Sequence, residues 1–139
     1  MKIVIITGSF DDLRSRPVRL LEEAAKSGRV RVLLWPDETM EFFTGKPPLF
    51  SEMERLYMVR AMRFVDEAEI GPPMKSAHVL TDVGLPGNTI WAVLPEDDHP
   101  VKRSFCAGVG ITLRVIPESD LAGFPVPTDD LTAPSTRKK

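Results

Sequence analysis

Hydrophobic runs alternate with amphipathic segments along this chain, and the first three segments set the pattern. Residues 2–6 (KIVII) end in an unbroken β-branched run, which predicts a strand buried on both faces of a parallel sheet. Residues 17–25 place apolar side chains at helical spacing. They open on Pro17, which fits the first turn of a helix because the N–H groups there have no partner. Residues 29–35 (RVRVLLW) predict a second strand, so the three segments predict a right-handed crossover unit.

The remaining segments continue this alternation. Ser51, followed three residues later by Glu54, is typical of a helix start. Residues 37–50 have no regular pattern, and GKPPLF at 45–50 is expected to form a loop. Further elements are expected at 51–64 (helix), 66–70 (short edge strand), 74–83 (one or two helical turns), 89–94 (core strand), 101–107 (helix) and 111–116 (strand).

Strands that alternate with helices predict one α/β domain with a doubly wound, Rossmann-like parallel sheet. We expect the strand order 3-2-1-4-5, with the first strand at the centre and helices on both faces. The domain is expected to span residues 1–124. Residues 125–139 are expected to form a polar, proline-rich C-terminal tail, ordered at best in part.

Composition narrows the classes of function. The chain has 139 residues, of which 42% are hydrophobic, enough for one domain with its own core. A formal net charge of −2 argues against non-specific nucleic-acid binding, so the expected partner is a small molecule. One cysteine permits no internal disulfide, and Cys106 is expected to be a small buried residue. The sequence shows no signal peptide and no long apolar span, so we expect a cytoplasmic protein without membrane association.

The turn after the first strand carries the first motif. GSFDDLRSRPVRLLEEA, from residue 8 onward, resembles the N-terminal signature of the cytidylyltransferase-like nucleotidyltransferases, in which G-[TS]-F-D precedes H-x-G-H. Arg14 and Pro17 occupy the two histidine positions, and Arg16 occupies the glycine position. The signature is therefore degenerate, with RSRP in place of HxGH. The residues in register are Gly8, Ser9, Phe10, Asp11, Leu13, Leu20, Leu21 and Ala25.

Two further stretches are similar to the same family. GKPPLFSEMERLYMVRAMRFVDE, residues 45–67, is similar to the second family motif and is the most specific match in the chain. Near the end, Ser135, Thr136 and Arg137 resemble the family's STR element, whose backbone and hydroxyl groups bind nucleotide phosphates.

The resemblance implies a reaction. In the family, the phosphate of an acceptor, here expected to be a small phosphorylated alcohol or sugar, attacks the α-phosphate of a nucleoside triphosphate and releases pyrophosphate. Catalysis in such a step is positioning plus cationic stabilisation. The implied cofactors are Mg²⁺ and CTP or ATP, and the implied assembly is a homodimer, for which Met40, Phe42 and Phe43 could supply apolar contacts. The candidate catalytic residues are Arg14, Arg16 and Lys46, and the candidate nucleotide-binding residues are Gly8, Ser9, Phe10, Asp11, Arg55, Lys102, Ser135, Thr136 and Arg137.

Simpler interpretations remain open for these residues. Arg14 and Arg16 could be solvated ends of a turn, Arg55 could pair with surface acids, and Asp11 could cap the first helix. The acidic run at 96–98 is expected to be solvated rather than to bind a metal, because oxygen ligands normally come from dispersed positions.

Two further functions stay open for the whole chain. One is a catalytically impaired relative that binds nucleotides or phosphate esters in regulation or assembly. The other is a general Rossmann-type binding domain, which fits the fold but leaves the second motif unexplained.

Overall fold

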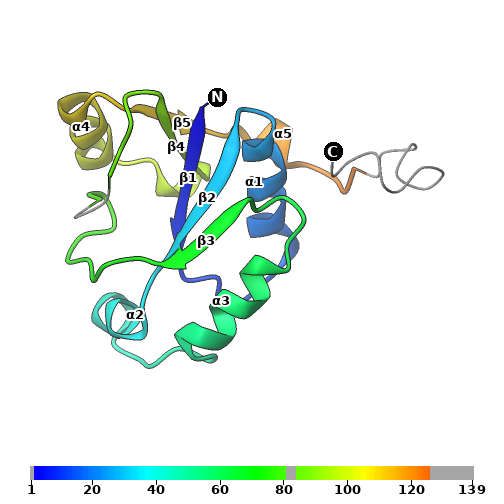
Figure 1. Cartoon of the computed structure of the whole chain (residues 1–139), viewed down its shortest axis with the longest axis vertical. Coiled ribbons are helices and arrows are strands. Elements are labelled where there is room, and N and C mark those ends of the chain that lie inside the picture. Colours follow the sequence, from blue (N-terminus) through cyan, green and yellow to red (C-terminus); the bar gives the residue numbers. More distant parts are fainter. Residues whose placement is uncertain (1, 81–83, 126–139) are drawn as a thin grey trace.

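A five-stranded parallel sheet forms the centre of the protein (Figure 1). The computed structural model describes residues 2–80 and 84–125. The strands are β1 (Ile3–Gly8), β2 (Arg29–Leu34), β3 (Glu67–Ile70), β4 (Thr89–Val93) and β5 (Thr112–Val115). Their order is β3-β2-β1-β4-β5, and Ile5 of β1 pairs with Arg31 on one side and Trp91 on the other. The predicted doubly wound α/β sheet, its strand order and its central strand are confirmed.

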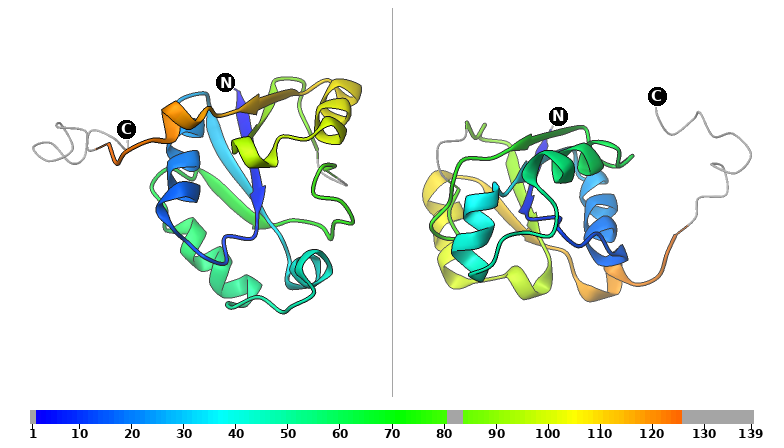
Figure 2. Two further views of the ribbon diagram at one scale, coloured as in Figure 1. Left: turned by 180° about the vertical axis from the view of Figure 1, so that it is seen from behind. Right: turned by 90° about the horizontal axis from the view of Figure 1, so that it is seen from below.

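Helices cover both faces of this sheet (Figure 2). Buried side chains of α1, α3 and α5 share one hydrophobic cluster, and those of α4 pack into the cluster on the opposite face with residues 74 and 80. The helices are α1 (Ser15–Ala25), α2 (Asp37–Thr44), α3 (Glu52–Arg60), α4 (Pro100–Val109) and α5 (Glu118–Leu121), with a short 3₁₀ helix η1 (Pro95–Asp97).

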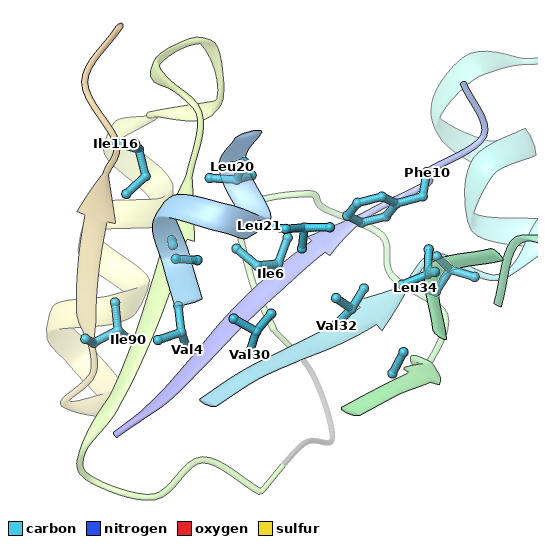
Figure 3. Close-up of a cluster of buried hydrophobic side chains, with 14 of the residues drawn as sticks. Val4, Ile6, Phe10, Leu20, Leu21, Val30, Val32, Leu34, Ile90 and Ile116 are labelled. Carbon is cyan, nitrogen blue, oxygen red and sulfur yellow. The ribbon is translucent and has the colours of Figure 1, made fainter. Parts of the chain in front are cut away.

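Alternate residues of β1 supply the core on each face. Val4 and Ile6 point toward Leu20 and Leu21 of α1 (Figure 3), whereas Ile5 lies in the cluster on the α4 face. All three β1 side chains are at most 1% exposed. Because both faces of the strand are buried, its sequence is continuously apolar rather than alternating.

The segment at 37–50, for which no helix was predicted, contains α2 in its first part, and the predicted loop at 45–50 follows the helix. Acidic residues in its first turn complement the helix dipole, and Gly45 ends it in the left-handed conformation with φ 77°. The helix has only 8 residues, too few to show a clear periodicity. Met40 is buried and the Phe43 ring packs against Trp35 at 4.8 Å, so Phe42 alone of the three apolar residues is well exposed, at 64%. The homodimer stays a prediction.

Smaller differences concern element ends. Ser51 caps α3 as predicted, accepting from the Glu54 N–H, but the helix ends at Arg60 rather than near residue 64. The described residues of the 74–83 segment, 74–80, contain no helix, and 81–83 lie outside the described residues. Across the described ranges no helix is both long and apolar enough to span a bilayer.

The chain after β5 is anchored to α1. Arg19, which is 6% exposed, donates to the backbone oxygens of Asp120 (2.6 Å) and Gly123 (3.1 Å), and Leu121 lies in the core. These contacts hold α5 and Gly123 against α1, and the described chain runs to residue 125. The predicted tail beyond it, which includes Ser135, Thr136 and Arg137, lies outside the described residues.

Gly28, between α1 and β2, tests this packing. A Cβ atom there would lie 2.3 Å from the backbone oxygen of Lys2. We expect Gly28→Ala to lower the free energy of unfolding by about 1–3 kcal/mol, because backbone atoms must move to admit the methyl group. Gly108→Ala, at a helical glycine with open space around its Cβ position, is the matched control and should not destabilise the protein. Urea denaturation measures both, and equal effects would contradict the packing described here.

Candidate functional site

A cavity of about 300 Å³ lies at the carboxyl ends of β1 and β4. Connections from these two adjacent strands run to opposite faces of the sheet, which is the position where ligands bind in open α/β folds. The lining residues are Ile6, Thr7, Gly8, Ser9, Phe10, Asp11, Asp12, Pro17, Leu20, Trp35, Ala77, His78, Ala92, Val93, Leu94, Asp97 and Lys102. The cavity therefore contains the GSFD turn predicted from the sequence.

The turn between β1 and α1 forms one wall. Phe10 adopts the left-handed conformation (φ 51°), which is uncommon for a residue with a side chain, and its ring is buried in the core. α1 then begins at Ser15, and its N-cap residue Arg14 makes no side-chain cap hydrogen bond. The Arg14 side chain therefore leaves the first N–H groups of the helix uncapped. Helix starts of this kind can bind an anion through those N–H groups.

Asp11 joins this turn to the second motif. Its two carboxylate oxygens accept hydrogen bonds from the backbone N–H groups of Leu49 (2.7 Å) and Phe50 (2.9 Å). Both carboxylate oxygens therefore bind the backbone of the loop that precedes α3. The expectation that Asp11 caps the first helix does not fit this arrangement, because its carboxylate partners lie in a different segment.

Arg55 is completely buried beneath the turn. Its guanidinium donates to the backbone oxygens of Ser9 (2.8 Å), Trp35 (2.8 Å) and Phe50 (3.0 Å), and to the Asp37 carboxylate (2.7 Å). Arg55 does not line the cavity. It ties together the ends of β1 and β2 and the starts of α2 and α3, so its geometry fits a positioning role.

The three candidate catalytic residues do not line the cavity. The Arg14 side chain is 79% exposed and pairs with Asp12 at 2.8 Å. Lys46 is exposed in the loop after α2. The Arg16 guanidinium donates to Glu96 (2.6 and 2.9 Å) and to Glu118 (2.5 and 2.8 Å). Arg16 thus bridges two carboxylates, and its guanidinium is not free to bind a phosphate. Its hydrogen bonds lower the pKa values of both Glu96 and Glu118.

The opposite wall carries a buried cation. Lys102 of α4 is 3% exposed, and its ammonium lies 4.7 Å from the centre of the Trp91 ring. Burial lowers the pKa of Lys102, while Asp97 acts in the opposite direction. Burial also raises the pKa of Asp97. Lys102 is the only lysine or arginine among the described residues that line the cavity.

Two stacked histidines adjoin Lys102. The rings of His78 and His99 lie 3.9 Å apart and nearly parallel. His99 is the N-cap of α4, and its Nδ1 accepts from the Val101 N–H, so this nitrogen carries no proton. Burial, followed by the charges of His99 and Lys102, lowers the pKa of His78, which favours its neutral form.

Trp35 and His78 are among the lining residues that the sequence analysis did not name as candidates. Trp35 directly follows β2, so its place at the carboxyl edge of the sheet was a usable signal. His78 lies in a segment without a regular pattern, and no motif marks it. Within the described ranges, no group of three or more His, Cys, Asp or Glu residues could hold a metal ion.

Comparison with known proteins identifies the family of this chain. FAD synthase from Pyrococcus abyssi is 34% identical over 116 residues, which cover 81% of this chain and 77% of that protein. The chain belongs to this family of nucleotidyltransferase-like proteins. FAD synthase from Picrophilus torridus is 34% identical over 81% of each chain. The match to FAD synthase from Methanocella paludicola is 40% identical but spans 72 residues, 51% of this chain and half of that relative.

A solved structure shares the fold of this family member. The crystal structure of the lipopolysaccharide core biosynthesis protein from Thermoplasma volcanium matches with a TM-score of 0.66 and 26% identity, over 83% of this chain and 93% of that one. No family model matches the chain. The sequence of the relatives and the fold of this neighbour both support the resemblance to nucleotidyltransferases that the sequence motifs indicated.

Removal of Arg55 should destabilise the fold. We expect Arg55→Met to lower the free energy of unfolding by about 3 kcal/mol, because three backbone carbonyls and the Asp37 carboxylate lose the guanidinium as their donor. Arg55→Lys should recover half of this loss at most, since one ammonium cannot reach all four partners. Arg14→Met, which removes an exposed pair, is the control and should change stability by less than about 1 kcal/mol. Urea denaturation that ranks Arg14→Met with Arg55→Met would contradict the assignment.

The Arg16 bridge predicts an acid-dependent contribution to stability. The folded-state pKa values of Glu96 and Glu118 are lowered below the ordinary 4.5, so their contribution is present above that pH and is lost as the pH falls through the lowered values. We expect Arg16→Gln to have a lower melting temperature than the native chain at pH 7, and the gap to close in acid below pH 4.5. A gap that persists unchanged at pH 3 or below would show that the bridge does not stabilise the fold.

Proposed function

We propose that this protein binds ATP and a phosphorylated acceptor such as FMN in the cavity, and transfers the adenylyl group to the acceptor at a low rate. The observation that carries the proposal is the GSFD turn, which lines the cavity at the junction of β1 and β4 and is held by Asp11 and Arg55. The relatives named FAD synthase support the choice of ATP and of a flavin phosphate as acceptor.

The proposed step is an in-line displacement. An oxygen of the acceptor phosphate bonds to the α-phosphorus of ATP, the bond from that phosphorus to the oxygen leading to the β-phosphate breaks, and pyrophosphate leaves. The backbone of Gly8–Phe10 and the start of α1 would hold the phosphates, because helix N-termini attract anions. The apolar residues of the lining, among them Ala92 and Leu20, would contact the uncharged part of the ligand.

A divalent cation fits the site only together with the nucleotide. Mg²⁺ usually binds substrate phosphates, waters and one or two carboxylates, so it needs no dedicated protein cage. Asp12 and Asp97 line the cavity and could contact such an ion through water. Bound Mg²⁺ would offset part of the triphosphate charge.

The low rate follows from the arginines. Two histidines normally donate to the phosphates during transfer, whereas here Arg14 faces solvent and Arg16 is held by Glu96 and Glu118. Loss of one transition-state donor typically costs about 10²–10³ in rate. A second candidate function is ligand binding without turnover. The same Arg16 bridge favours it, because the guanidinium that could replace a histidine is already paired with two carboxylates.

Binding and turnover can be measured separately. We expect calorimetry with ATP and Mg²⁺ to show saturable binding that is tighter than binding of CTP. We expect slow pyrophosphate release when FMN is added. Absence of binding by any nucleotide would refute the proposed function, and binding without detectable pyrophosphate release would leave the second candidate function in place of the first.

Restoring the signature gives the matched variant. The triple change Arg14→His, Arg16→Gly and Pro17→His rebuilds HxGH at its family positions. If the missing donors limit the rate, this variant should release pyrophosphate at least about 10²-fold faster with little change in ATP affinity. A rate equal to that of the native chain would locate the limitation elsewhere in the site.

A further inference from the structure

We propose that Lys102 and His78 form a subsite for one phosphate group of the cavity ligand, on the wall opposite the β1–α1 turn. The inference rests on the proposed function and deepens it, because it assigns the charge recognition to residues of α4 and of the segment before β4. The phosphate could belong to the nucleotide or to the phosphorylated acceptor, and both present the same chemistry.

Lys102 is the stronger half of the subsite. Lys102 is 3% exposed, yet within the described residues its ammonium makes no hydrogen bond and no ion pair. An ammonium has three N–H donors, and burying a charge without partners is costly. The Trp91 ring makes a cation–π contact with the ammonium, 4.7 Å from the ring centre, but accepts no conventional hydrogen bond from it. The remaining donors face a cavity that Lys102 itself lines.

His78 supplies a second unsatisfied group. Its Nδ1 atom is buried and has no hydrogen-bond partner among the described residues, although the residue lines the cavity. Stacking on His99, which is fixed as the cap of α4, holds the ring in place. This nitrogen is therefore free to pair with a group bound in the cavity.

The charges around Lys102 favour an anion of this kind. Asp97 lines the same wall and attracts Lys102, but no ion pair within 4.0 Å joins them, and burial raises the pKa of Asp97. Asp11 already accepts two backbone hydrogen bonds, and Asp12 is paired with Arg14. With both signature arginines away from the cavity, Lys102 is the cation within its described lining that can meet a phosphate.

Paired ligands with and without phosphate isolate this subsite. The native chain and Lys102→Met are titrated with FMN and riboflavin, and with AMP and adenosine, by fluorescence or calorimetry. We expect Lys102→Met to weaken FMN or AMP binding about 10- to 100-fold, the effect of one hydrogen bond to a charged group. Binding of the matching phosphate-free ligand should change less than about twofold, since it makes no such bond. Loss confined to the flavin pair assigns the phosphate to the acceptor, and loss confined to the adenine pair assigns it to the nucleotide.

Controls separate this inference from folding and from the proposed function. Arg103→Met changes the neighbouring residue, which pairs with Asp98 outside the cavity, and should leave all four affinities unchanged. His78→Phe keeps the aromatic stack but removes the ring nitrogens, and should weaken only the phosphorylated ligands. An unchanged preference for phosphorylated ligands in Lys102→Met would overturn the subsite while leaving the proposed function intact. If the native chain binds neither ATP nor any of the four ligands, the proposed function fails, and pyrophosphate alone decides: saturable binding that Lys102→Met abolishes supports the subsite, and no binding overturns it.

Discussion

The buried guanidinium of Arg55 is the contact on which the carboxyl edge of the sheet depends. Four partners from separate parts of the chain converge on it, and three of them are backbone carbonyls that have no other described side-chain donor. A buried charge is tolerated only when hydrogen bonds and an opposite charge surround it. The carbonyls and Asp37 supply both, so the ends of β1 and β2 cannot shift independently of α2 and α3. Arg55 thereby fixes the backbone at Ser9 and Trp35, two residues that line the cavity.

Asp11 completes the same junction from the other direction. Arg55 donates to backbone oxygens of the β1–α1 turn, while Asp11 in that turn accepts from backbone N–H groups of the loop before α3. Charge-assisted hydrogen bonds therefore run in both directions between the β1–α1 turn and the segment around the start of α3. This reciprocity explains why the two sequence motifs occur together: each supplies the side chain that fixes the backbone of the other.

The fold could be predicted because it depends on patterns of apolar residues. The run at Ile3–Ile6 indicates a strand buried on both faces, and the alternation of elements leaves few topologies. α2 was missed because its 8 residues are stabilised by packing against Trp35 and by Gly45 rather than by an extended periodic pattern. In the cavity, motif comparison placed the GSFD turn and position along the chain suggested Lys102. It could not show that Arg16 would find Glu96 and Glu118, which are 80 and 102 residues away. Contacts of that range are set by the packing of helices and leave no local trace in the sequence.

Pro17 has a consequence for the ligand as well as for the helix. Arg14 is the N-cap and α1 begins at Ser15, so Pro17 stands fourth among the positions whose N–H groups are free of intrahelical partners, and proline has no N–H. A relative with histidine there would offer both a ring nitrogen and a backbone donor at the same point. This chain offers neither, and its helix start presents three backbone donors, at Arg14, Ser15 and Arg16, instead of four. An anion bound in the cavity would therefore meet fewer donors at the start of α1, and in the proposed subsite it would lie closer to α4.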